Sequence, residues 1–259
     1  MSSIDHRGRR VACRSCVYGL LILAFVLLPA WSTTAAAQTT ADQDQAEAWL
    51  LTYGPGEIYW QRFGHNAIWI RDPARGLDHA FNFGFFDFNQ ERFFLRFLQG
   101  RMLYFSAAQP VREEFAAYID ENRSIRAQKL DLEPEQLLRL TAFLVNEVQA
   151  ENREYLYDYY LNNCSTRVRD AIDLALGGAL AARYRWLDAP QSWRDQTRRL
   201  TSPDFWLYLG LEIGLGAPVD RRISLWDETF IPGELADAVA AMDITRDGTT
   251  RPLVAEDVM

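Results

Sequence analysis

The segment Glu154–Gly178 constrains the fold most strongly, because it predicts a helix that begins at a cysteine. Its apolar residues at intervals of four are Cys164, Val168, Ile172 and Leu176. Residues spaced in this way share one face of a helix. Asn162 or Asn163 is suited to cap the start of this helix, and the pair Gly177-Gly178 is suited to end it. We therefore expect the thiol in the first helical turn, on the face that packs against the rest of the protein.

A β-hairpin is predicted upstream of this helix. His65–Ile70 and Leu77–Phe83 both combine β-branched and aromatic residues, as strands do, and RDPARG between them has the composition of a turn. If the residues that flank RDPARG pair with each other, His65 lies opposite Asn82, and opposed residues share one face of a sheet. His79 then points to the other face, and it replaces Asn82 as the candidate partner if the register slips by one residue.

The first 37 residues have the pattern of a secretory signal peptide. A stretch rich in arginine precedes an apolar run over residues 17–28, which is shorter than the roughly 20 residues that span a bilayer. Ala35, Ala36 and Ala37 then fit the rule for signal-peptidase cleavage. We expect cleavage before Gln38 and a periplasmic mature protein, and an uncleaved N-terminal anchor is the alternative.

Cys164 becomes the single cysteine of the mature chain, since Cys13 and Cys16 lie in the leader. Exported proteins usually pair their cysteines, so an odd one indicates a free thiol. At a helix N-terminus the dipole and the free N–H groups favour a thiolate and can hold an oxyanion, and a nearby imidazole can act as base. We predict Cys164 as nucleophile, His65 as base and Asn82 as the residue that orients the imidazole. A buried structural cysteine and a structural histidine are the alternatives.

The charge and motif content excludes several other functions. The chain carries 35 acidic and 27 basic residues, for a net charge of −8, and four of the basic residues lie in the leader. Nucleic-acid binding requires clustered basic residues, so we expect no nucleic-acid partner. The sequence contains no H-E-x-x-H, no G-x-S-x-G and no phosphate-binding glycine loop. We therefore expect neither a metal nor a cofactor.

The remaining sequence predicts one domain over residues 38–242 and a polar, disordered tail over 243–259. Aromatic residues are concentrated in the run Phe85, Phe86, Phe88, Phe93, Phe94, Phe97, Tyr104 and Phe105. Burial statistics favour a place in the hydrophobic core for such a run. The alternative is a groove for an acyl chain, or a face in peripheral contact with a membrane.

Three segments resemble a known family: GPGEIYWQRFGHNAIWI, HAFNFGFFDF and YLYDYYLNNCSTRVRDAID. They are similar to the Lnb N-terminal periplasmic domain, a former domain of unknown function now named after a bacterial lipoprotein N-acyltransferase. The order of histidine before cysteine also resembles the circularly permuted NlpC/P60 group of papain-like enzymes. The resemblance implies an α+β fold in which a small antiparallel sheet packs against the helix that carries the cysteine.

The same resemblance implies acyl chemistry at the thiol, with Cys164, His65 and Asn82 in the roles given above. Further residues of the matched motif would support the site: Asn163, Ser165, Thr166 and Arg167. Three functions stay open. The first is acyl transfer through a cysteine thioester, with a phospholipid or a lipoprotein as substrate. The second is hydrolysis of an amide bond in cell-wall peptide, as in NlpC/P60 enzymes. The third is a binding module without catalysis.

Overall fold

A computed structural model describes residues 45–87, 96 and 101–259 of the chain. The predicted signal peptide over residues 1–37 lies outside the described residues. Four members of the aromatic run also lie outside them: Phe88, Phe93, Phe94 and Phe97. The description below concerns the unit formed by residues 46–259.

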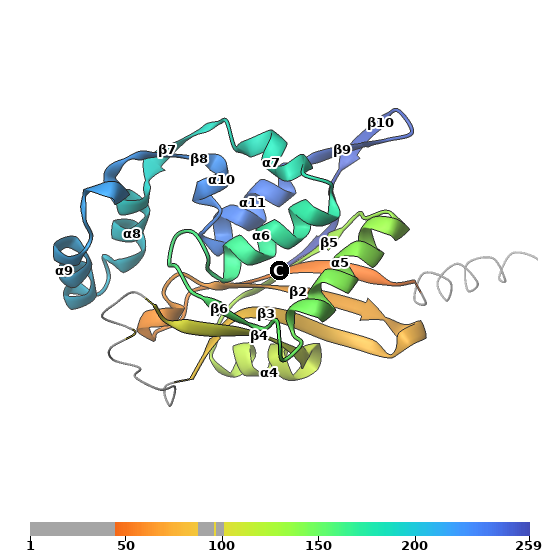
Figure 1. Ribbon diagram of the computed structural model, residues 1–259, viewed down its shortest axis with the longest axis horizontal. Helices are drawn as coiled ribbons and strands as arrows, with labels where there is room; N and C mark the ends of the chain where they lie inside the picture. The colour runs from red at the N-terminus through yellow and green to blue at the C-terminus, as the bar shows by residue number, and fades with distance from the viewer. Residues whose placement is uncertain (1–44, 88–95, 97–100) are drawn as a thin grey trace, which may run out of the picture. The chain divides into compact units, whose positions relative to one another are not determined.

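A seven-stranded antiparallel sheet with the order β11-β5-β1-β2-β3-β4-β6 forms the centre of this unit (Figure 1). The strands are β1 (Glu47–Tyr53), β2 (His65–Asp72), β3 (Leu77–Phe86), β4 (Leu103–Pro110), β5 (Ile125–Leu130), β6 (Glu154–Leu156) and β11 (Val254–Val258). The fold is therefore of the predicted α+β class. The sheet is larger than the small one that the family resemblance implied.

Helices cover both faces of the sheet (Figure 1). The helices of the larger layer are α5 (Pro134–Glu147), α6 (Cys164–Ala175), α7 (Ala179–Tyr184) and α11 (Pro232–Ala240). They enclose the main core with Leu50, Ile68 and Phe83, whereas α4 (Val111–Asp120) packs on the other face with Leu51 and Ala67. Because β1 is buried on both faces, its residues 48–51 form a continuous apolar run instead of an alternating one.

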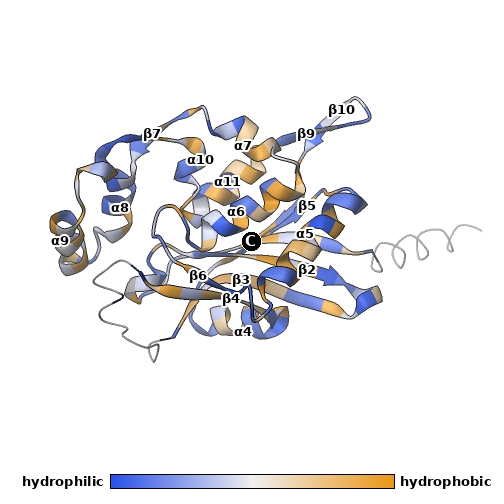
Figure 2. Cartoon of the chain, viewed as in Figure 1, coloured by the Kyte–Doolittle hydropathy of each residue, from blue (hydrophilic) through white to orange (hydrophobic). Residues whose placement is uncertain are grey.

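Helices α6 and α11 carry many hydrophobic residues (Figure 2). Among them, Val168, Ile172 and Leu235 are fully buried in the main core. The burial of each such side chain stabilises the folded state by about 1.5–3 kcal/mol. The predicted spacing of apolar residues after Cys164 is confirmed, because α6 begins at Cys164 and buries Val168 and Ile172.

A smaller set of elements lies beside this core and has a core of its own. They are β7 (Asp188–Ser192), α8 (Trp193–Thr201), α9 (Phe205–Gly214), β8 (Arg222–Ser224) and α10 (Leu225–Glu228), with a short 3₁₀ turn at Ala217–Asp220. Trp193, Ile223 and Phe230 are buried together here. Two further 3₁₀ turns, Tyr59–Gln61 and Pro73–Arg75, lie between strands of the main sheet. Among the described residues, no helix has both the length and the apolar character needed to cross a lipid bilayer.

The predicted hairpin is present, but its register differs by two residues from the prediction. The strands extend to Asp72 and Leu77, which pair with each other, so Asn82 lies opposite Ala67 and not opposite His65. The turn is tighter than the six-residue turn of the prediction. The Asp72 carboxylate accepts a hydrogen bond from the backbone N–H of Arg75 at 3.3 Å and closes a 3₁₀ turn. A shift by an even number keeps every side chain on its predicted face.

The prediction that residues 243–259 are a disordered tail is wrong. They form a hairpin of β9 (Asp243–Arg246) and β10 (Thr249–Pro252), and then strand β11, which pairs with β5. Strand β11 lies at the edge of the sheet and is mostly exposed, so its composition is polar although its backbone is paired. Arg126 holds the Asp257 carboxylate through two hydrogen bonds of 3.0 and 2.8 Å. The folded domain therefore extends past residue 242.

Candidate active site

Asn163 fixes the first turn of α6, where Cys164 lies. Its side-chain oxygen accepts from the backbone N–H of Thr166 at 2.9 Å, and the Thr166 hydroxyl accepts from the backbone N–H of Asn163 at 2.8 Å. The Asn163 amide also donates to the carbonyl of Phe230 at 2.9 Å, and the Ser165 hydroxyl donates to the carbonyl of Thr229 at 2.7 Å. These bonds attach the cysteine-bearing turn to the segment that precedes α11, so the thiol has little positional freedom.

Arg167 attaches α6 to a neighbouring helix. Its guanidinium donates to the Glu147 carboxylate of α5 at 2.5 Å and lies 4.1 Å from the ring centre of Tyr155. Three of the four predicted supporting residues thus hold the start of α6, and Arg167 joins α6 to α5.

His65 is the first residue of β2, and the glycine before it is required for structural reasons. Gly64 has a φ of +80°, and a Cβ on it would lie 2.6 Å from the carbonyl oxygen of Tyr53. The His65 ring stacks on the Tyr53 ring with a centroid distance of 6.0 Å. The backbone and this neighbouring ring therefore set the position of the imidazole.

Cys164 and His65 meet where β2 and β3 stop pairing. The pairing of the two strands ends at Ala67 and Asn82, and β3 then bulges at Gly84, which has a φ of +105°. The Cβ of Cys164 lies 3.5 Å from the point where a Cβ on Gly84 would stand. The opening at the end of the hairpin therefore admits the thiol, although α6 packs on the opposite face of the sheet from the Asn82 side chain.

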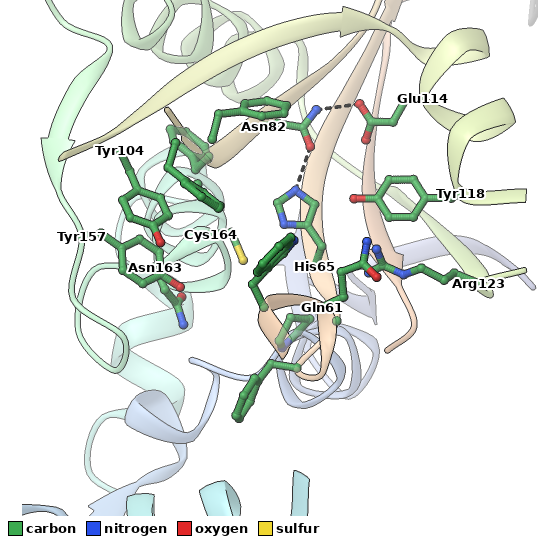
Figure 3. A pocket seen from close by; sticks show the side chains of 18 of the residues that line it. Gln61, His65, Asn82, Tyr104, Glu114, Tyr118, Arg123, Tyr157, Asn163 and Cys164 are labelled. Carbon is green, nitrogen blue, oxygen red and sulfur yellow. Dashed lines mark hydrogen bonds between the residues drawn. The ribbon is translucent and has the colours of Figure 1, made fainter. Parts of the chain in front are cut away.

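The predicted contact between His65 and Asn82 is present as a diagonal pair. His65 Nε2 and Asn82 Oδ1 are 2.8 Å apart (Figure 3). His65 also hydrogen-bonds with Cys164. Diagonal neighbours on one face of a sheet can touch through long side chains. The structure therefore brings the three residues together, with His65 in contact with Cys164 on one side and with Asn82 on the other. His79 lies on the other face of β3, opposite Ile70, and is not among the residues that line the cavity described below.

The electrostatics of the pair favour a thiolate beside an imidazolium. Burial alone would raise the pKa of the Cys164 thiol, but the charge and the hydrogen bond of His65 outweigh burial and hold that pKa below its ordinary value. Backbone N–H groups of Asn66 and Ser165 also donate to the sulfur and lower the thiol pKa. Burial would lower the pKa of His65, but the Cys164 charge and hydrogen bonds to Cys164 and Asn82 raise it.

Two residues that the sequence did not point to extend the arrangement behind Asn82. Glu114 of α4 is 4% exposed, and its carboxylate accepts from Asn82 Nδ2 at 2.6 Å and from the Tyr53 hydroxyl at 2.5 Å. Its negative charge also raises the pKa of His65. The helix that carries Glu114 could be predicted, but nothing in its sequence distinguishes Glu114 from its exposed neighbour Glu113.

The thiol and the imidazole lie in a cavity of about 380 Å³. On one side is a set of contacting rings, which we call the aromatic wall: Trp60, Phe86, Tyr104 and Tyr157. On the other side is a polar wall: Gln61, Tyr118, Glu121 and Arg123. Figure 3 shows labelled residues of the two walls on opposite sides of the Cys164–His65 pair. Three residues of the aromatic run thus line this cavity: Phe85, Phe86 and Tyr104.

Comparison with known proteins identifies the family of this chain. The model of a protein family, the Lnb N-terminal periplasmic domain, matches residues 33–199, which is well over half of the chain. The match includes Cys164, His65, Asn82 and Glu114. No curated protein matches the chain, and no solved structure does.

Proposed function

The chain belongs to the family of Lnb N-terminal periplasmic domains, and we propose that it is an exported thiol acyltransferase that moves an acyl chain from a phospholipid to an amine. The observation that carries this proposal is the Cys164–His65 pair between an aromatic and a polar wall. Residues 1–37 would deliver the protein as a cleaved signal peptide. The intact mass of the exported protein tests cleavage, and a mass that retains these residues would contradict it.

The first half of the reaction forms a thioester. The Cys164 thiolate attacks the ester carbonyl of the phospholipid, and the carbon–oxygen bond of the ester breaks. The lysophospholipid alkoxide leaves and takes the proton of the His65 imidazolium. His65 Nε2 is held by Asn82, so the nitrogen that faces the thiol and the leaving group is Nδ1.

The second half transfers the acyl group to the acceptor. A neutral amine, such as the N-terminus of a lipoprotein, attacks the thioester carbonyl and loses its proton to the now neutral His65. The carbon–sulfur bond breaks, an amide forms, and Cys164 leaves as thiolate beside an imidazolium. The pair thus returns to its starting state, and its shifted pKa values favour that state.

The two walls of the cavity suit the two substrates. The aromatic wall offers an apolar surface for an acyl chain, and cavities of several hundred Å³ are typical of sites for small molecules. On the polar wall, Glu121 accepts hydrogen bonds from Gln61 at 3.0 Å and from Arg123 at 3.1 Å. With Glu114 nearby, that side of the cavity carries acidic groups, which would attract an approaching amine.

A transfer assay tests the proposal. The protein is incubated with a phospholipid that carries an isotope-labelled acyl chain and with a lipopeptide that has a free N-terminal amine. We expect a labelled amide on the lipopeptide with the wild-type protein, and none with Cys164→Ala or with an N-acetylated lipopeptide. Absence of the amide with the wild-type protein, or an equal yield with Cys164→Ala, would contradict acyl transfer.

The polar wall also favours a second candidate function, hydrolysis of an amide bond in cell-wall peptide, as the NlpC/P60 resemblance implies. The same thioester would form, with water in place of the amine as acceptor. Profiling of soluble peptides released from purified cell wall separates the two candidates. New peptides that depend on Cys164 support hydrolysis, and an unchanged profile counts against it.

A further inference from the structure

Helix α9 exposes an apolar face outside the cavity. Its sequence, FWLYLGLEIG, contains one charged residue, and none of its ten side chains, all of which the structure describes, is buried. The exposed fractions of Phe205, Trp206 and Ile213 are 62%, 77% and 78%, and Leu209 is also exposed. These four residues fall at helical spacing on one side of α9. Large apolar faces of this kind mark interaction surfaces.

The polar contacts of α9 fix this face outward. Glu212 accepts from Arg198 of α8 through two hydrogen bonds of 2.9 and 2.6 Å, and Arg194 lies 3.8 Å from the same carboxylate. The Asp204 side chain caps the start of the helix by accepting from the backbone N–H of Leu207 at 3.0 Å. Because the single acid of α9 is neutralised by arginines on the α8 side, the outward face presents no negative charge to its surroundings.

We propose that α9 is a membrane-docking helix, which inserts Phe205, Trp206, Leu209 and Ile213 into the boundary between the headgroups and the acyl chains of a lipid bilayer. A helix of ten residues is about half the length needed to cross a membrane, so α9 lies along the surface. Aromatic residues beside leucine and isoleucine are typical of such interfacial helices. The absence of negative charge on this face favours binding to a bilayer, because anionic headgroups repel acidic residues.

A second copy of the chain is a poorer occupant for this face. Stable protein–protein interfaces bury about 800 Å² and 20–30 residues on each partner. The apolar face of α9 offers only the four side chains named above. An exposed charged residue of α8, Arg198, lies next to α9, since it binds Glu212.

Packing contacts connect α9 to the cavity. Tyr159, which lines the cavity, packs edge-on against Tyr160 at 4.9 Å between ring centres. Tyr160 contacts Trp193 at 5.4 Å and shares a hydrogen bond of 2.9 Å with Thr197 of α8, the helix that holds α9. Docking through α9 would therefore place the cavity at a fixed position relative to the membrane. This inference goes beyond the proposed chemistry, since none of the four docking residues lines the cavity.

Fluorescence quenching by brominated lipids tests the inference on the full-length protein. The vesicles contain phosphatidylethanolamine and a minor share of phosphatidylglycerol, both with brominated acyl chains. We expect quenching of tryptophan fluorescence in the wild-type protein that is lost in Trp206→Phe, because phenylalanine keeps the helix apolar but removes the reporter. The matched control is Trp186→Phe, since Trp186 is 83% exposed and lies outside α9. Quenching that persists undiminished in Trp206→Phe would overturn the proposal.

The double variant Phe205→Ser/Ile213→Ser measures the strength of docking. Each exposed side chain removed from the bilayer should weaken vesicle binding by at least about tenfold, so the pair weakens it by about 100-fold. Binding equal to that of the wild type, together with a dimer that the same variant dissociates, would overturn membrane docking in favour of self-association. Cys164→Ser should bind vesicles as the wild type does. Vesicle binding therefore reports on docking alone, and its failure can be distinguished from failure of the acyl chemistry.

Discussion

The Asn82 side-chain amide donates to the buried carboxylate of Glu114 at 2.6 Å, and this contact determines which way the amide points. A carboxylate only accepts hydrogen bonds, so Nδ2 must face Glu114 and Oδ1 must face His65. His65 Nε2 then carries a proton, and Nδ1 faces the thiol of Cys164. Glu114 therefore acts on the imidazole through Asn82, as a positioning residue.

Loss of the Asn82 side chain should reduce turnover without a matching loss of substrate binding. In Asn82→Ala the imidazole has no acceptor for its Nε2 proton, and a misplacement of about 1 Å can cost about 10²-fold in rate. We expect kcat to fall by about that factor and KM to stay near its wild-type value. A KM that rises while kcat is unchanged would show that Asn82 contacts the substrate instead.

The rate of thioester formation should follow a bell-shaped pH profile. Acylation needs the Cys164 thiolate and the His65 imidazolium together. Isolated side chains, with pKa values of about 8.5 for cysteine and 6.5 for histidine, rarely hold that combination. In this protein the thiol pKa is lowered and the imidazole pKa is raised. The rate should therefore fall below the lowered thiol pKa and above the raised imidazole pKa.

Glu114→Gln should move only the alkaline limb of this profile. The variant keeps the shape of the side chain but removes the charge that raises the pKa of His65, so the imidazolium is lost at lower pH. The matched control is Glu113→Gln on the exposed side of α4, which should leave both limbs in place. An alkaline limb unchanged in Glu114→Gln would contradict the role given to this carboxylate.

Replacement of His65 should make the thiol less acidic. Without the imidazole, burial is the larger effect and raises the pKa of Cys164, so His65→Gln should react with iodoacetamide only at higher pH than the wild type. The control is His79→Gln, which removes the other described histidine from the opposite face of the hairpin and should react as the wild type does. If wild-type Cys164 reacted no faster than a denatured-state thiol, a binding module would be the better account.

Gly84→Ala should damage the site beyond its effect on stability. A residue with a side chain at a φ of +105° strains the backbone, at a cost of about 1–2 kcal/mol, and the new methyl group would stand against Cys164. Gly76→Ala is the matched control, since Gly76 also has a positive φ but has open space around it. We expect both variants to lose stability in urea denaturation, and only Gly84→Ala to lose thiol reactivity.

The position of Cys164 at the start of a helix could be predicted because the information is local. A cap at Asn163, apolar residues at intervals of four and a glycine pair all lie within one segment, and the structure confirms the helix they indicate. The face of His65 and Asn82 could also be predicted, since strand alternation survives an even shift of register. The register itself could not, because it depends on how Asp72 closes the turn.

Glu114 and β11 could not be predicted because their roles are set by tertiary packing. Glu114 comes close to Asn82 only when α4 packs on the sheet, and the chain between them gives no sign of that contact. The polar composition of the last residues suggested a loose tail, yet Leu253 is fully buried and β11 pairs with β5. Pairing at a sheet edge satisfies the backbone without requiring apolar side chains on the exposed face.

The intact mass of the protein after incubation with a phospholipid tests the central claim most directly, since that claim is that Cys164 accepts an acyl group. We expect the wild-type protein to gain the mass of one acyl chain, located on Cys164 by peptide mapping and removed by hydroxylamine. Cys164→Ala should show no gain under the same conditions. A wild-type protein that gains no mass, or an equal gain in Cys164→Ala, would contradict the account.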